Sequence, residues 1–166
     1  MDSSPISVAR RLSSGCRPAS SRRYATVSAA TAGGQVAFPG VGVYHAAKWG
    51  LEGFSEALAA ELAPFGVQVM IVEPGGIRTG FTGSTVMAEP MPAYKGTPVD
   101  AMRQFSADPA ATGGDPATMA ARILATTTQD LVPRRLVLGS DAFEAITSTL
   151  TDRLAEISPQ RENAKL

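Results

Sequence analysis

Tyr44 and Lys48 are the two residues of this 166-residue chain whose types and spacing best fit catalysis. Residues four apart lie on one face of an α-helix, one turn of about 5.4 Å from each other. A lysine ammonium at that distance favours the charged form of the phenol, because opposite charges attract. The phenol would then serve as a proton donor and acceptor near neutral pH. The same spacing also occurs as a solvated pair on ordinary helices, so the flanking residues decide between the two interpretations.

Both flanks of the pair carry further signals. A loop of small residues, 31–40, precedes it, and its first residue, Thr31, places a hydroxyl thirteen residues before Tyr44. Residues 67–72 are apolar apart from Gln68, as expected for a parallel strand that helices cover on both faces. The turn Pro74-Gly75 follows this strand. Along the chain, a hydroxyl residue is therefore followed by a tyrosine–lysine pair on a helix, and then by a turn at the end of a strand.

This order resembles the C-terminal half of the short-chain dehydrogenase/reductase family, in which a serine, a YxxxK helix and a PGxxxT turn follow one another. The resemblance covers roughly residues 26–158. It implies an oxidoreductase that transfers a hydride between a nicotinamide dinucleotide, NADP or NAD, and a small-molecule carbonyl or alcohol. The sequence identifies neither the substrate nor the preference between NADP and NAD.

The resemblance also assigns roles to residues. Tyr44 is the general acid or base, and Lys48 tunes Tyr44 and holds the nicotinamide ribose. Thr31 takes the place of the family's serine and orients the substrate oxygen; Ser28 is the alternative if the loop holds an insertion. Segment 80–110 corresponds to the substrate lid. The cofactor-binding residues that the resemblance implies are Tyr44, Lys48, Pro74, Gly75, Ile77 and Thr79.

Composition excludes several other kinds of site. His45 is the only histidine and Cys16 the only cysteine, so a multi-histidine metal site, a cysteine metal cluster and an intrachain disulfide are excluded. We expect no metal, and we expect His45 to be a partly exposed, noncatalytic helix residue beside Trp49. No stretch reaches the roughly 18 apolar residues that span a bilayer. We expect a cytoplasmic protein with no nucleic-acid or membrane partner, and the Tyr44 helix is the candidate surface for a homo-oligomer.

Residues 1–23 differ in composition from the rest. They carry five arginines and one acid, a net charge of +4, whereas residues 24–166 carry −4. Few large apolar residues are present to offset the entropy of ordering, so we expect a disordered basic leader. A transit peptide and a nucleic-acid-binding tail are alternatives, but the segment lacks amphipathic length and aromatic residues. A mis-set start of the reading frame is the third alternative.

Residues 24–166 are predicted to form the C-terminal catalytic half of one α/β domain. We expect strands at 24–29, 67–72 and 135–138, with helices at 43–63, 99–106, 117–127 and 141–156. Asp115 and Asp141 are the predicted caps of the last two helices. The fold class is therefore a partial Rossmann-like, doubly wound parallel sheet of about three strands flanked by helices.

Two stripes are predicted on the helix at 43–63. One is mainly apolar, from Tyr44 through Phe54 to Leu62, and the other consists of small residues that allow close packing: Ala46, Gly50, Gly53, Ala57 and Ala60.

The glycine-rich loop that holds a dinucleotide pyrophosphate is not found after a strand near the N-terminus. The dinucleotide-binding half of the fold is therefore expected to be missing. This leaves open whether the chain is an active enzyme or a truncated, noncatalytic remnant or interaction module, which would associate along its open sheet edge. Binding of a dinucleotide distinguishes these alternatives.

Overall fold

The computed structural model describes residues 24–80, 86–107 and 113–165. The predicted leader, residues 1–23, and parts of the segment predicted as a lid lie outside the described residues. Three parallel strands form one sheet in the order β1-β2-β3, with β1 at Tyr24–Ala29, β2 at Val67–Pro74 and β3 at Arg135–Leu138. The predicted α/β class and three-stranded parallel sheet are confirmed.

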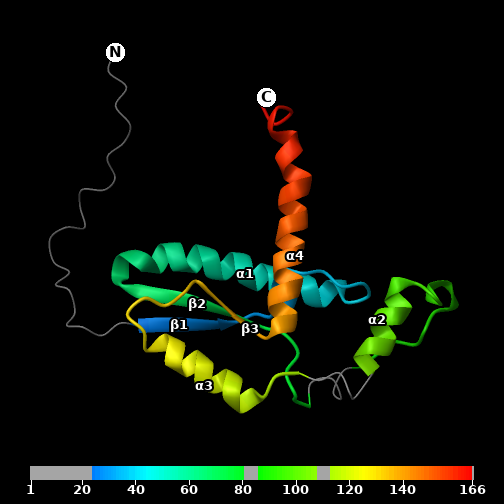
Figure 1. The fold of residues 1–166 in the computed structure, drawn as a ribbon, viewed down its shortest axis with the longest axis horizontal. Helices are drawn as coiled ribbons and strands as arrows, with labels where there is room; N and C mark the ends of the chain where they lie inside the picture. The colour runs from blue at the N-terminus through cyan, green and yellow to red at the C-terminus, as the bar shows by residue number, and fades with distance from the viewer. Residues whose placement is uncertain (1–23, 81–85, 108–112, 166) are drawn as a thin grey trace.

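Helices lie on both faces of this sheet, as in a doubly wound fold. Figure 1 shows α1, Gly42–Leu62, along one face and α3, Pro116–Thr127, along the other. Helix α4, Ser140–Ile157, begins at the end of β3 and projects away from the sheet, while α2, Pro98–Ala107, lies to one side. Four short 3-10 helices complete the described elements: Ala32–Gly34 (η1), Ala63–Phe65 (η2), Pro92–Tyr94 (η4) and Ser158–Arg161 (η5).

Strand β2 forms the centre of the core. Its side chains alternate between the two faces, because successive residues of a strand point in opposite directions. Met70 and Val72 pack with Val132 and with half-buried side chains of α3 and β3. The strand continues two residues beyond the prediction, so Glu73 belongs to it and is fully buried. A charged side chain therefore lies in the interior, on the face opposite Met70 and Val72.

The face of α1 that packs on the protein is not the predicted apolar stripe. The buried residues of this helix are His45, Glu52, Ser55 and Ala59, whereas Phe54 of the predicted stripe is 63% exposed. The predicted stripe of small residues, from Ala46 to Ala60, is exposed in full. Polar partners from other elements stabilise the buried side chains of α1, as shown below, so the buried face of this helix follows neither stripe.

The ends of the helices agree with the prediction in most places. Asp115 caps α3, and its carboxylate accepts a hydrogen bond from the backbone N–H of Thr118 at 2.8 Å. Asp141 does not cap α4, because the N-cap residue is Gly139. Helix α2 spans ten residues and extends one residue beyond each end of the predicted segment, 99–106. None of the helices in the described part of the chain is long and apolar enough to cross a bilayer.

Candidate active site

The structure brings together Thr31, Tyr44 and Lys48 beyond the carboxyl end of β1. The Tyr44 hydroxyl lies 3.4 Å from Thr31 Oγ1 and donates a long hydrogen bond to it. The Lys48 Nζ lies 5.9 Å from the centroid of the Tyr44 ring and donates to the carbonyl of Ala29 at 3.3 Å. The helix supplies the tyrosine–lysine spacing, and the loop after β1 supplies the second hydroxyl. A substrate oxygen beside Tyr44 could therefore meet two hydroxyl groups at once.

Thr31 is held by the short helix η1 that follows it. Its Oγ1 accepts a hydrogen bond from the backbone N–H of Gly33 at 2.9 Å, which makes Thr31 the N-cap of η1. Ser28, the alternative to Thr31, is on β1 and accepts from Ser55 Oγ at 2.8 Å, in a contact between strand and helix α1. Tyr44 thus contacts the hydroxyl of Thr31, and the Ser28 hydroxyl is engaged by Ser55.

The turn after β2 contains the remaining predicted residues. The Gly75 N–H donates to Leu138 O at 2.9 Å, and the Gly76 N–H donates to Asp141 Oδ2 at 2.7 Å. A methyl group on Gly75 would meet Asp141 Oδ2 at 2.2 Å, so a larger residue at this position would displace the Asp141 carboxylate. Hydrogen bonds therefore connect the turn to the start of α4. The Asp141 side chain makes one of these bonds and does not cap the helix.

Ile77 forms a parallel bridge with Gly114, in which Gly114 donates to Gly76 O at 2.8 Å and Arg78 donates to Gly114 O at 3.1 Å. Both bonds use neighbours of Ile77, so its own N–H and C=O point to the opposite side of the segment. Pro74 ends β2, and Thr79 is exposed just beyond the bridge.

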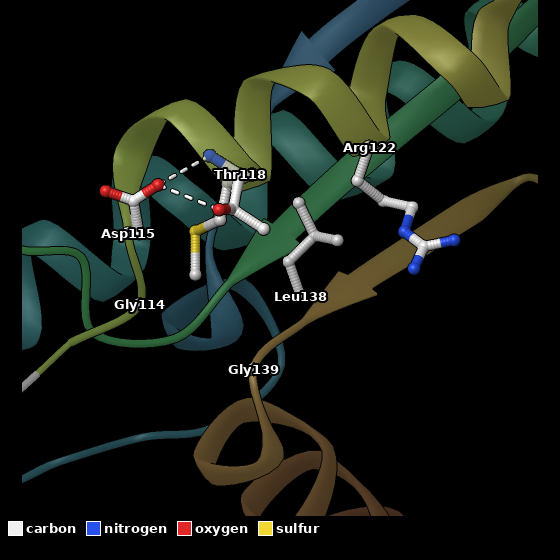
Figure 2. A pocket seen from close by; sticks show the side chains of 7 residues that line it. Gly114, Asp115, Thr118, Arg122, Leu138 and Gly139 are labelled. Atoms are coloured by element: carbon white, nitrogen blue, oxygen red, sulfur yellow. Dashed lines mark hydrogen bonds between the residues drawn. The ribbon is translucent and has the colours of Figure 1, made fainter.

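A cavity of about 250 Å³ lies on the α3 side of this turn. Figure 2 shows it between the first turns of α3 and the end of β3, with Asp115 bonded to Thr118 at one end and Arg122 at the other. Neither Thr31, Tyr44 nor Lys48 lines it. The cavity is therefore separate from the predicted catalytic residues.

His45 is buried, contrary to the prediction of a partly exposed residue, with 6% of its surface accessible. Its Nδ1 lies 2.8 Å from Gly33 O, and its Nε2 accepts a hydrogen bond from the Phe38 N–H at 2.8 Å. The ring therefore joins helix α1 to both halves of the preceding loop.

A buried charge cluster beneath the site was not predicted from the sequence. Arg135 Nε lies 3.0 Å from Glu73 Oε1, and Arg135 Nη2 lies 3.1 Å from Glu52 Oε2 and also contacts Glu56. The amide of Gln35 donates to Glu73 Oε1. One oxygen each of Glu52 and Glu73 is buried without a hydrogen-bond partner. Burial, reinforced by the charge of Glu73, raises the pKa of Glu52 to about 7.

Sequence signals for this cluster were present but weak. Glu73 and Arg135 are diagonal neighbours on adjacent strands, since Arg135 is paired with Ile71. The sequence shows a glutamate at the end of one apolar strand and an arginine at the start of the next. Whether the two side chains meet depends on the register of the strands, which the sequence does not give.

Comparisons with known proteins agree with the observed fold. Residues 21–90 match a family model described as short chain dehydrogenase. Oxidoreductase BOA17 of Botryotinia fuckeliana is 36% identical over 116 residues, which make up 68% of this chain and 41% of that protein. A 3-ketodihydrosphingosine reductase of Bacteroides thetaiotaomicron is 41% identical over 68 residues, 41% of this chain and 25% of the reductase.

Among solved structures, a short-chain dehydrogenase from Streptomyces avermitilis superposes with a TM-score of 0.76 and 38% identity, over 85% of this chain and 51% of that one. This chain therefore spans less than half the length of the two curated relatives and about half of the solved structure.

Proposed function

The chain belongs to the short-chain dehydrogenase/reductase family, and on that premise we propose that it carries the proton-transfer half of a site that interconverts a carbonyl and an alcohol. The observation that supports this most directly is the contact of the Tyr44 hydroxyl with Thr31 Oγ1 at 3.4 Å. Both residues follow the carboxyl end of a parallel strand, where ligands of such sheets bind. In this proposal Tyr44 donates a proton to the substrate oxygen during reduction and accepts it during oxidation.

Thr31 orients the substrate oxygen in the proposed reaction. Its Oγ1 already accepts from Gly33 N–H and from the Tyr44 hydroxyl. The hydroxyl proton of Thr31 is therefore the group left to donate, and a substrate carbonyl beside Tyr44 can accept it. The methyl group of threonine leaves less space for the substrate beside this hydroxyl than a serine would. Lys48 places a positive charge near the Tyr44 ring, with its Nζ 5.9 Å from the ring centroid.

The turn after β2 fits the nicotinamide end of a dinucleotide, NADP or NAD. A bound nicotinamide supplies or removes the hydride at the carbonyl carbon. The backbone N–H and C=O of Ile77 face away from the bridge to Gly114, so they remain for the carboxamide, with Pro74, Gly75 and Thr79 beside it. In the described residues, neither a G-x-x-x-G-x-G nor a G-x-G-x-x-G loop follows a strand to hold a pyrophosphate. We expect weak binding by these residues alone, because the remote contacts that position a nicotinamide are not among them.

The test compares the 166-residue chain with a chimera that joins it to the nucleotide-binding half of the Streptomyces avermitilis relative. The assay follows NADPH and NADH consumption with a panel of aliphatic, aromatic and steroid-like ketones. We expect little turnover by the chain alone, measurable turnover by the chimera, and loss of that turnover in Tyr44→Phe. Glu61→Gln is the control, because Glu61 is exposed on the same helix and lies outside both the site and the segment predicted as a lid. A chimera whose turnover is indifferent to Tyr44→Phe would refute the role of Tyr44.

A noncatalytic interaction module is the second candidate. In the described sheet, β1 pairs with β2 alone, so its other edge carries unpaired backbone groups, and Val27 on this strand is 42% exposed. Such an edge favours association with another strand. Calorimetry with NADPH distinguishes the two functions. Micromolar binding of NADPH by the 166-residue chain would contradict the hypothesis of a noncatalytic module. Failure of both the chain and the chimera to bind NADPH would favour that hypothesis.

A further inference from the structure

We propose that His45 is a positioning residue that holds Thr31 at the Tyr44 hydroxyl, an inference that rests on the proposed function. His45 is adjacent to Tyr44 on α1, and its side chain is directed into the loop that carries Thr31. The two residues of the proposed proton-transfer pair are therefore linked through it.

The hydrogen bonds define the state of the ring. The Phe38 N–H can only donate, so His45 Nε2 must be the unprotonated acceptor of this 2.8 Å bond. The carbonyl of Gly33 can only accept, so Nδ1 must carry the proton and donate across 2.8 Å. The neutral imidazole with its proton on Nδ1 satisfies both partners, whereas neither the other tautomer nor the charged ring does so.

Gly33 transmits this constraint to Thr31. Its carbonyl accepts from His45, and its N–H donates to Thr31 Oγ1 at 2.9 Å. The two peptide groups that flank Gly33 thus connect the His45 imidazole to the Thr31 hydroxyl, which contacts Tyr44. The space is also closely filled, since a methyl group on Gly33 would lie 3.1 Å from Tyr44 Cε1 and 3.2 Å from His45 Cε1. A shift of the loop would therefore alter the distance between Thr31 and Tyr44.

Two conservative variants distinguish the roles of the two ring nitrogens of His45. His45→Asn places an amide N–H near the position of Nδ1 and retains the bond to Gly33. His45→Gln places a carbonyl oxygen near the position of Nε2 and retains the bond to Phe38. His45→Phe keeps a ring but leaves both partners unsatisfied. If His45 acts through Gly33, only the asparagine variant keeps Thr31 in place.

The first test is NMR spectroscopy of the 166-residue chain. We expect the ring nitrogens of His45 to show a protonated Nδ1 and an unprotonated Nε2, and we expect a nuclear Overhauser contact between Thr31 and the Tyr44 ring. This contact should persist in His45→Asn and disappear in His45→Gln. Val43→Ala is the matched control, because Val43 lies in the same first turn and is 89% exposed. A contact that persists equally in the asparagine and glutamine variants would overturn the inference, even if the phenylalanine variant fails to fold.

The second test uses the turnover assay of the chimera. A displaced Thr31 would misorient the substrate oxygen, and a displacement of about 1 Å can cost on the order of 100-fold in rate. We expect kcat to fall by about 10- to 100-fold in His45→Gln with KM nearly unchanged, and to recover in His45→Asn. A purely structural role would lower the amount of folded enzyme but leave kcat per folded molecule unchanged, and that outcome would overturn the inference. Absence of turnover in the parent chimera would count against the proposed function, while the NMR test would still decide the role of His45.

Discussion

Replacing Glu52 with glutamine should change how the stability of the protein depends on pH. Glu52 is 6% exposed, and its carboxyl shares Arg135 with two other glutamates and has one buried oxygen without a partner. Its pKa in the folded protein is about 7, compared with an ordinary value of 4.5. Between these values the folded chain binds more protons than the unfolded chain, so the free energy of unfolding falls as pH rises.

The size of this effect follows from the shift. A difference of about 2.5 pKa units corresponds to about 3 kcal/mol, which Glu52 contributes in full below pH 4.5 and loses as pH rises through about 7. A glutamine has no proton to lose and can donate an N–H to the unsatisfied oxygen of Glu73. The stability of Glu52→Gln relative to the parent chain should therefore rise by about 3 kcal/mol between pH 4.5 and pH 8.5.

Urea denaturation followed by circular dichroism at four or five pH values measures this difference. Other titrating groups contribute to both proteins and cancel when the two curves are subtracted. Glu61→Gln is the control, because Glu61 is an exposed glutamate of the same helix. If the stability of the parent chain and that of Glu52→Gln depended on pH in the same way, the raised pKa of Glu52 and its proposed cause, burial in this cluster, would be refuted.

Other predictions concern glycines and the turn after β2. Gly53→Ala should stabilise the protein by about 0.5–1 kcal/mol, because the methyl group meets nothing within 4 Å and alanine favours the helix. Gly34→Ala should destabilise it, because the methyl group would lie 2.9 Å from Glu52 Cγ; thermal melts measure both. Asp141→Ala should remove the acceptor of the Gly76 N–H, lower stability by about 1–2 kcal/mol and speed hydrogen exchange at Gly76. Asp152→Ala, on the exposed part of the same helix, should do neither.

Local patterns in the sequence were sufficient to predict most of the elements. The strands at Tyr24–Ala29 and Arg135–Leu138 have the predicted bounds, and α1 differs from the prediction by one residue at each end. The cap at Asp115 was predicted because an acid followed by proline begins a helix through contacts within four residues. Spacing identified Tyr44 and Lys48, and the family resemblance added Thr31, whose Oγ1 lies 3.4 Å from the Tyr44 hydroxyl in the structure.

Two local predictions failed where a distant residue supplied a partner. Asp141 has the type and position of a cap, yet its carboxylate accepts from Gly76, 65 residues away in the chain. His45 was expected to be partly exposed, but the loop before α1 folds back and surrounds its ring with a donor and an acceptor. In each case the side chain has more than one possible partner, and only the path of the chain selects between them.

The sequence by itself determined the strand and helix types, the caps that act within one turn, and the tyrosine–lysine pair on one helix. Only the tertiary structure decided which face of α1 is buried and which charges lie inside. Glu52 and Glu73 would normally remain in water, because burying an unpaired charge is costly. Arg135 approaches them from a strand 83 and 62 residues further along the chain, and this neutralises part of their charge. Hydrophobic periodicity records the preference of each side chain for water, but burial depends on the partners that the fold brings to it.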